Sequence, residues 1–112
     1  MTRALARKID AARVFHALGD PTRRTIVERL SLGPASVTHL SGPLRITPTA
    51  VGQHLRVLEE SGLVRTQKTG RVRTCRIETE GFSVLETWIG EQRSLWNRRL
   101  DRLGDMLAQD GE

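Results

Sequence analysis

The stretch "ITPTAVGQHLRVLEESGLV", residues 46–64, decides the fold because it combines a helix start, an amphipathic helix and a helix stop. Thr47 is a suitable N-cap, and Pro48 fits the first helical position, where a backbone N–H is not needed. Apolar residues then follow at i, i+4 and i+7 and predict one buried stripe, formed by Val51, Leu55 and Leu58. Gly62 ends the predicted helix.

The outward face of this helix is polar and surrounds a glycine, Gly52. Gly in a helix interior is about 1 kcal/mol less favourable than Ala, so this face suggests a use beyond that of an ordinary surface helix. The major groove of B-DNA admits an α-helix and offers donor and acceptor patterns that Gln and Arg can read. We therefore predict a DNA recognition helix, with Gln53 as the leading base reader and Arg56 reaching a base or a phosphate. Thr47 and Thr49 lie near the helix N-terminus, where they can bond phosphate oxygens.

Three helices are predicted before this one. Residues 3–18 carry apolar side chains at spacings of three and four, which indicates an amphipathic helix with Leu5, Ile9, Ala12, Phe15 and Leu18 on one face. The pair Asp20–Pro21 opens a second helix that runs to about Leu32. Its inward face is formed by Ile26, Val27 and Leu30. Ser36 caps a short third helix, whose end must be shortened or kinked by Gly42–Pro43.

Residues 63–77 switch to a period of two around Thr69–Gly70, where Gly can supply the positive φ of a tight turn, so a β-hairpin is predicted. The hairpin holds basic residues and no acidic one: Arg65, Lys68, Arg71, Arg73 and Arg76. This charge suits an acidic partner, although charge runs are also common on merely solvated surfaces. Cys75 alternates with Arg73 and Ile77, which favours a packed strand residue over a reactive thiol.

A long helix is predicted from Glu80 to about residue 108. Its stripe alternates steps of three and four residues and comprises Leu85, Ile89, Gln92, Trp96, Leu100, Leu103 and Leu107. A stripe of this length exceeds what the short preceding elements can cover, so it requires a partner helix. Trp88 and Trp96 fit core or interface anchors better than the walls of a ligand pocket.

Length and charge narrow the class of protein. The chain has 112 residues and a net charge of +5, which suits one domain, 1–112, that gains from association. Residues 1–79 hold 14 Lys and Arg against 6 Asp and Glu, whereas residues 80–112 hold 4 against 7. The single cysteine excludes an internal disulfide, and no apolar run approaches the roughly 20 residues of a membrane span. A soluble, cytoplasmic protein without a membrane partner is predicted.

Helices followed by a recognition-type helix and a basic hairpin are the order of a winged helix-turn-helix. Four segments resemble the ArsR/SmtB family of bacterial transcriptional repressors: "FHALGDPTRRTIVERL" (15–30), "TAVGQHLRVLEESGLV" (49–64), "GRVRTCRI" (70–77) and the Trp-bearing C-terminal helix. The resemblance implies a mainly α fold with a β-hairpin wing, in the order ααααββα, that acts as a dimer on operator DNA. It further implies dimerisation helices at 1–18 and 80–108, a helix-turn-helix at 36–61 and a wing at 63–77.

The resemblance also assigns residues to two surfaces. The predicted DNA-binding residues are Thr47, Thr49, Gln53, His54, Arg56, Lys68, Arg71 and Arg73. For His54 a phosphate contact or a structural bond is expected rather than base reading. The predicted dimer interface comprises Leu5, Ile9, Ala12, Leu85, Ile89, Trp96, Leu100 and Leu103. Gly52 departs from the family, where Ser is usual, and we interpret it as a specificity variation against the alternative of drift. Pro43 and Pro48 depart as well.

Many relatives release DNA when a metal binds, but the ligands of those sites are missing here. Ser36 and Thr38 occupy the positions of the helix cysteines, and no histidine follows His54. We therefore predict no metal and no cofactor. The sequence leaves room for a small-molecule inducer but names none. A metal-responsive repressor of the same family is one alternative, and a winged-helix module that docks an acidic protein is another. An enzyme is not expected, because no catalytic constellation stands out.

Overall fold

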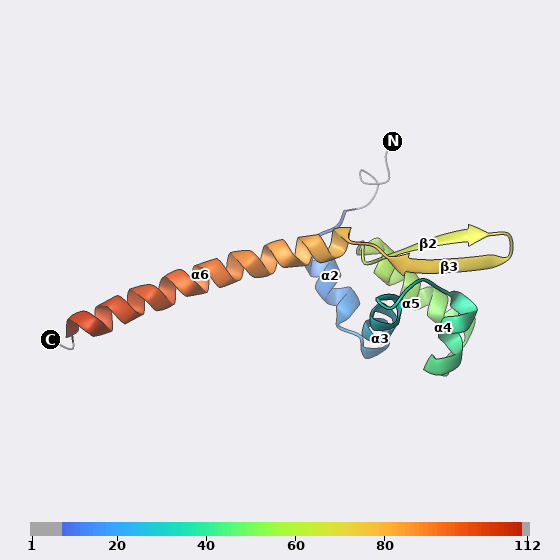
Figure 1. The fold of residues 1–112 in the computed structure, drawn as a ribbon, viewed down its shortest axis with the longest axis horizontal. Coiled ribbons are helices and arrows are strands. Elements are labelled where there is room, and N and C mark those ends of the chain that lie inside the picture. The colour runs from blue at the N-terminus through green and yellow to red at the C-terminus, as the bar shows by residue number, and fades with distance from the viewer. Residues whose placement is uncertain (1–7, 111–112) are drawn as a thin grey trace.

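The computed structural model describes residues 8–110, which form a mainly helical chain with one three-stranded sheet (Figure 1). In order, the elements are α2 (Ala11–Leu18), α3 (Pro21–Leu30), β1 (Ala35–Ser36), α4 (Val37–Leu44), α5 (Pro48–Glu60), β2 (Val64–Thr69), β3 (Val72–Ile77) and α6 (Glu80–Asp110). The predicted fold class is confirmed, with one short strand, β1, in addition. A strand of two residues is too short to show a period in the sequence.

The short helices begin at side chains that cap them. Asp20, Ser36 and Thr47 have extended backbones, and each side chain accepts a hydrogen bond from the N–H three residues on. Such a cap satisfies one of the N–H groups that a helix leaves unpaired at its start. The predicted caps of α3, α4 and α5 are therefore confirmed.

The first predicted helix begins later than the apolar spacing indicated. Asp10 has an extended backbone and accepts from the Arg13 N–H at 2.9 Å, so α2 starts at Ala11 and residues 8–10 are not helical. The capping carboxylate outweighs the continued apolar pattern, and Ile9 packs against the core from the preceding segment. Leu5 lies outside the described residues.

The face that α2 buries also differs from the prediction. Val14 and Ala17 are fully buried, whereas Phe15 is 45% exposed and Ala12 is exposed. The predicted stripe followed spacings of three and four residues, whereas Val14 and Ala17 face the core of the single chain. The assignment of Ala12 to the dimer interface stays a prediction.

Helices α3 and α4 end close to the predicted positions. Helix α3 ends at Leu30 rather than near Leu32, which is 85% exposed. Helix α4 continues through Pro43 to Leu44, and Arg45 closes it in the left-handed conformation with φ 57°. The helix therefore ends one residue after the proline, and its closing residue adopts the left-handed conformation that often follows a helix end.

The sheet has the antiparallel order β1-β3-β2. The hairpin turn falls at Gly70, with φ 62°, between the paired residues Thr69 and Val72, as predicted. Strand β1 pairs Ala35 with Cys75, so it joins the start of α4 to the inner end of the wing.

Apolar side chains from α2, α3, α4, α5 and the sheet form one core, whose members include Ile26, Leu30, Leu40, Val51, Leu55, Leu58, Leu63 and Val64. Cys75 is fully buried within it, which confirms the predicted packed strand residue. Burial raises the pKa of the Cys75 thiol to about 11, so the thiol is protonated at neutral pH.

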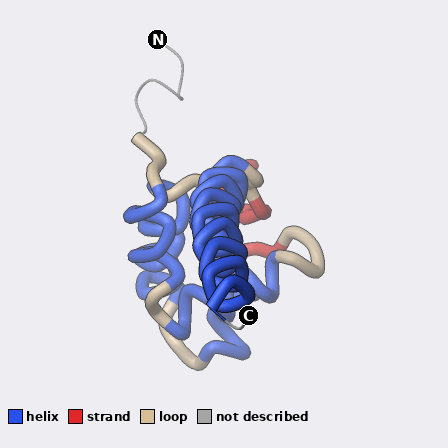
Figure 2. The backbone as a smooth tube through the Cα atoms, turned by 90° about the vertical axis from the view of Figure 1, so that its left-hand side faces the viewer, coloured by secondary structure: helices blue, strands red, loops and turns tan. Residues whose placement is uncertain are grey.

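Helix α6 begins on the core and then leaves it. Gly81 N donates to Gly62 O at 2.8 Å, and α6 packs beside α2. Beyond that contact the helix projects away from the body, opposite to the wing, so that the molecule measures 73 × 37 × 20 Å (Figure 1). Figure 2 looks nearly along α6, and Figure 1 shows the other elements gathered at its first part. Within residues 8–110 no helix combines the length and the apolar character that a membrane crossing needs.

Candidate nucleic-acid interface

The buried stripe on one side of α5 determines which face of the helix is exposed to solvent. Val51, Leu55 and Leu58 are fully buried, which fixes the rotation of α5 about its axis. Thr49, Gln53 and Arg56 are exposed on the outer side, at spacings of three and four residues. The predicted outward face is therefore the face that the structure presents to solvent.

The N-terminus of α5 is open as well. Thr47 Oγ1 accepts from Ala50 N at 3.1 Å, and both Thr47 and Thr49 are exposed. The first turn of a helix carries backbone N–H groups without intrahelical partners, and it attracts anions. A phosphate oxygen can therefore approach Thr47, Thr49 and this turn together.

A groove of about 330 Å³ separates α5 from the wing, and it is lined by Thr49, Gly52, Gln53, Arg56, Glu59 and Arg73. The groove brings Gln53 of α5 and Arg73 of β3, which are 20 residues apart in the chain, to one surface. A Cβ atom added at Gly52 would meet nothing within 4 Å. The packing of the chain itself therefore does not require glycine there.

The strand register divides the basic residues of the wing into two sets. Lys68 pairs with Arg73, and Arg65 pairs with Arg76. Since side chains alternate between the two faces of a strand, Lys68 and Arg73 share the face of the buried Cys75, toward α5, while Arg65 and Arg76 lie on the other. Of these residues, Arg73 lines the groove beside α5. Lys68 shares its face of the hairpin, and Arg71 is exposed at the turn.

A hydrogen-bond network ties the wing to α5. Glu59 accepts from the N–H of Thr66 at 3.1 Å and from its hydroxyl at 2.9 Å. Arg73 donates to the same hydroxyl oxygen at 3.2 and 3.3 Å, and its guanidinium lies 3.8 Å from the Glu59 carboxylate. Sequence reasoning missed Glu59 and Thr66, because they lie seven residues apart on different elements. Arg73 is 48% exposed and therefore combines a structural bond with a solvent-facing charge.

His54 lies on α5 but contacts the start of α3. Its Nδ1 is 3.9 Å from Asp20 Oδ2 and 3.5 Å from the Arg23 guanidinium. The hydrogen bond from the Arg23 backbone N–H lowers the pKa of Asp20 against the opposing effect of desolvation, and the charges of Arg23 and His54 lower it further. Of the two roles expected for His54, the structure thus provides the bond.

The residues predicted to form a dimer interface lie mainly on α6. Ile89, Trp96, Leu100 and Leu103 are 41 to 59% exposed, and Leu107 is 62% exposed. Leu85 is half-buried against the core. Trp88 stacks edge-on against Phe15 of α2 with ring centroids 5.0 Å apart. The apolar stripe of α6 thus continues past the core of its own chain without a cover within residues 8–110.

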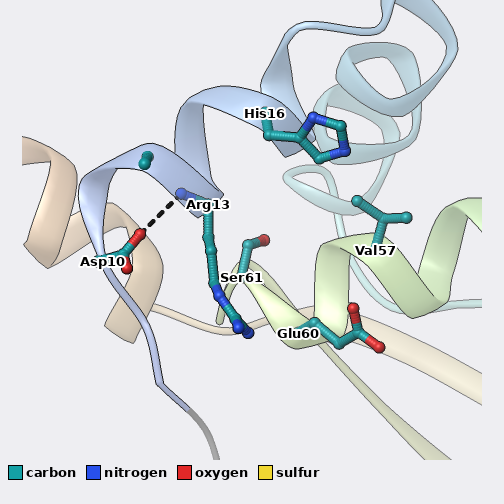
Figure 3. A pocket seen from close by; sticks show the side chains of 7 residues that line it. Asp10, Arg13, His16, Val57, Glu60 and Ser61 are labelled. Atoms are coloured by element: carbon teal, nitrogen blue, oxygen red, sulfur yellow. Dashed lines mark hydrogen bonds between the residues drawn. The ribbon is translucent and has the colours of Figure 1, made fainter.

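A second cavity, of about 380 Å³, lies between α2 and the end of α5. Figure 3 shows Arg13 reaching from α2 toward Glu60 and Ser61, with His16 opposite Val57. This cavity is lined by both acidic and basic side chains and lies apart from the polar face of α5. It therefore does not extend the basic surface. No group of three or more His, Cys, Asp or Glu residues within 8–110 is arranged to hold a metal ion.

Comparisons with known proteins agree with this geometry. Residues 20–66 match the family described as "Bacterial regulatory protein, arsR family". The chain is 35% identical over 100 residues to the HTH-type transcriptional regulator Rv2034 of Mycobacterium tuberculosis, covering 89% of this chain and 91% of that protein.

Solved structures are similar as well. The ArsR family transcriptional regulator RHA00566 is 48% identical, with a TM-score of 0.72 over 77% of this chain and 89% of that one. An ArsR-like transcriptional regulator from Rhodococcus sp. RHA1 is 28% identical, with a TM-score of 0.77 over 88% and 90% of the two chains.

Proposed function

Because this chain belongs to the ArsR family of bacterial regulatory proteins and is a DNA-binding transcriptional regulator, we propose that it is a repressor that occupies a pseudo-palindromic operator as a homodimer. The observation that carries this proposal is the exposed polar face of α5 beside the basic face of the wing, with the groove between them. A helix and a hairpin so placed can follow the major groove and the adjacent backbone of one duplex.

Within this proposal, each residue has a separate role. Gln53 reads a base edge and Arg56 reaches a base or a phosphate, while Thr47 and Thr49 bond phosphate oxygens at the start of α5. Lys68, Arg71 and Arg73 neutralise backbone phosphates from the wing, and His54 supports α5 through its contacts with α3. Two copies joined through α6 and the N-terminal region present two such surfaces with two-fold symmetry.

The direct test is fluorescence anisotropy with DNA from upstream of the gene and with a scrambled duplex, across a salt series. We expect tighter binding to the upstream duplex at every salt concentration and a steep decrease in affinity as salt rises. Equal affinity for both duplexes would show binding to a basic surface without sequence recognition. If the chain bound an acidic protein and excess DNA did not compete with that binding, the result would favour a protein-interaction module.

Gln53→Ala is expected to weaken binding to the operator by about 1–3 kcal/mol and to relax discrimination at one base position, because a base-edge contact is lost. Arg71→Ala is the matched comparison, since it removes a wing charge rather than a base reader. It should weaken all sequences alike and reduce the salt slope by about one. Competition titrations with single-base operator variants measure both. An equal loss on operator and random DNA for Gln53→Ala would contradict the base-reading role.

Gly52→Ala is expected to separate stability from DNA binding. The added methyl group enters open space and improves helix propensity, so the free energy of unfolding should rise by about 1 kcal/mol. The same methyl group would stand on the groove that faces DNA, so operator affinity should fall. Urea denaturation and anisotropy on the same preparation measure the two effects. A more stable protein with unchanged operator affinity would show that Gly52 does not set the approach to DNA.

A further inference from the structure

The C-terminal end of α2 is bonded by a side chain of the next helix. Arg23 Nε donates to Ala17 O at 2.7 Å, and its Nη2 donates to His16 O at 3.1 Å. These are carbonyl groups of the last turn of α2, where the backbone of a helix leaves carbonyls without intrahelical partners, and His16 O also accepts from Gly19 N at 3.2 Å. A cation is also favoured at that end by the helix dipole. Arg23 is thus fixed to α2 although it belongs to α3.

The same guanidinium contacts the recognition helix. Arg23 Nη1 lies 3.5 Å from His54 Nδ1, in a partly buried position. Asp20 completes the contact, because its carboxylate accepts from the Arg23 backbone N–H at 3.0 Å and lies 3.9 Å from His54 Nδ1. The Arg23 side chain therefore contacts both the end of α2 and the middle of α5, while its backbone N–H bonds the cap of α3.

We propose that Arg23 is a positioning residue that sets the orientation of α5 relative to α2 through His54. Helix α2 packs against α6, where Phe15 stacks on Trp88. The contact therefore extends from the helices of the proposed dimer interface to the helix of the proposed DNA surface. A dimer must place two recognition helices in successive turns of one groove, so a change in the tilt of α5 alters the fit at both half-sites. This inference rests on the proposed function.

Arg24 provides a matched control on the neighbouring position. Its Nη1 donates to Leu18 O at 2.7 Å, so it carries the same charge and bonds the same end of α2. The contact with His54 Nδ1 is made by Arg23, whereas the guanidinium of Arg24 bonds Leu18 O. Each of Arg23→Gln and Arg24→Gln removes one charge and side-chain bonding to the end of α2, two bonds in the first case and one in the second, and Arg23→Gln also removes the contact with His54.

The first measurement uses the DNA-free protein. Nitrogen-15 NMR should show a changed His54 ring signal and shifted amide signals along α5 in Arg23→Gln, and neither change in Arg24→Gln. The second measurement is operator affinity, which should fall about tenfold in Arg23→Gln and less than about twofold in Arg24→Gln. The salt slope should stay unchanged in Arg23→Gln, because the side chain acts through His54 and not on a phosphate.

His54→Gln removes the same contact from the other side and serves if Arg23→Gln does not fold. It should shift amide signals at the end of α2 and lower operator affinity about tenfold, and the double variant should lose little more than either single one. Equal effects of the Arg23 and Arg24 variants, an unchanged His54 signal, additive losses or a flatter salt slope would each overturn the inference. Failure of the wild-type protein to discriminate between duplexes would instead count against the proposed function, while the NMR comparison would still decide the role of Arg23.

Discussion

Gly81→Ala is expected to lower the free energy of unfolding by about 3 kcal/mol, because overpacking against backbone cannot be relieved by a side-chain rotation. A Cβ atom at this position would stand 2.9 Å from the carbonyl carbon and oxygen of Gly62 and closer still to Ser61 O. The methyl group would force α6 away from the turn after α5. It would also disrupt the hydrogen bond from Gly81 N to Gly62 O, which satisfies an N–H in the first turn of α6.

Gly90→Ala is the control for this prediction. Gly90 lies in the interior of the same helix, and a Cβ atom there would meet nothing within 4 Å. Its replacement should therefore raise the free energy of unfolding by about 1 kcal/mol. Urea denaturation followed by circular dichroism measures both variants, at one protein concentration because association contributes to stability. Equal stability of the two variants would show that α6 does not start in contact with Gly62.

Leu100→Glu is expected to raise the dissociation constant of the dimer by at least about 100-fold, because a buried carboxylate without a partner is strongly unfavourable. Leu100 is 57% exposed in the single chain, so the substitution leaves the core intact. Loss of the dimer should also remove most of the operator affinity, since a single half-site then has to hold the protein. Because the proposed dimer interface lies on α6, we expect this loss of operator affinity to exceed that of any other surface substitution.

Ser94→Glu introduces the same charge on the opposite side of α6, where the side chain is exposed. It should leave both the dimer and the operator affinity unchanged. Light scattering over a range of protein concentrations measures association, and anisotropy with the operator duplex measures binding. A Leu100→Glu protein that stays dimeric like Ser94→Glu would exclude this part of α6 from the interface.

Local patterns in the sequence predicted most of the fold. The caps at Asp20, Ser36 and Thr47 and the buried stripe of α5 were correct. Each depends on contacts within three or four residues or on a simple period, and such contacts are encoded in neighbouring positions. The start of α2 was misplaced because two local signals competed. The apolar spacing continued toward the N-terminus, while the carboxylate of Asp10 capped the helix later.

The candidate DNA surface was predicted only in part. The outward face of α5 and the basic wing follow from the alternation of apolar and polar residues. The hydrogen bonds that join α5 to the wing do not follow from that alternation. Glu59 contacts Thr66 and Arg73 only when the hairpin folds back onto α5. For the same reason the sequence could not show that only Lys68 and Arg73 of the paired basic residues face that helix.

By itself, the sequence determined which segments of this protein are helices and which form the hairpin, and which side of α5 stays polar. The tertiary structure alone decided that Arg23 joins α2 to His54, that Gly81 lies against Gly62 and that β1 pairs with Cys75. Those partners lie between 6 and 40 residues apart in the chain. Hydrogen-bond geometry within one turn is fixed by the backbone, whereas contacts between elements depend on how all of the buried faces pack at once.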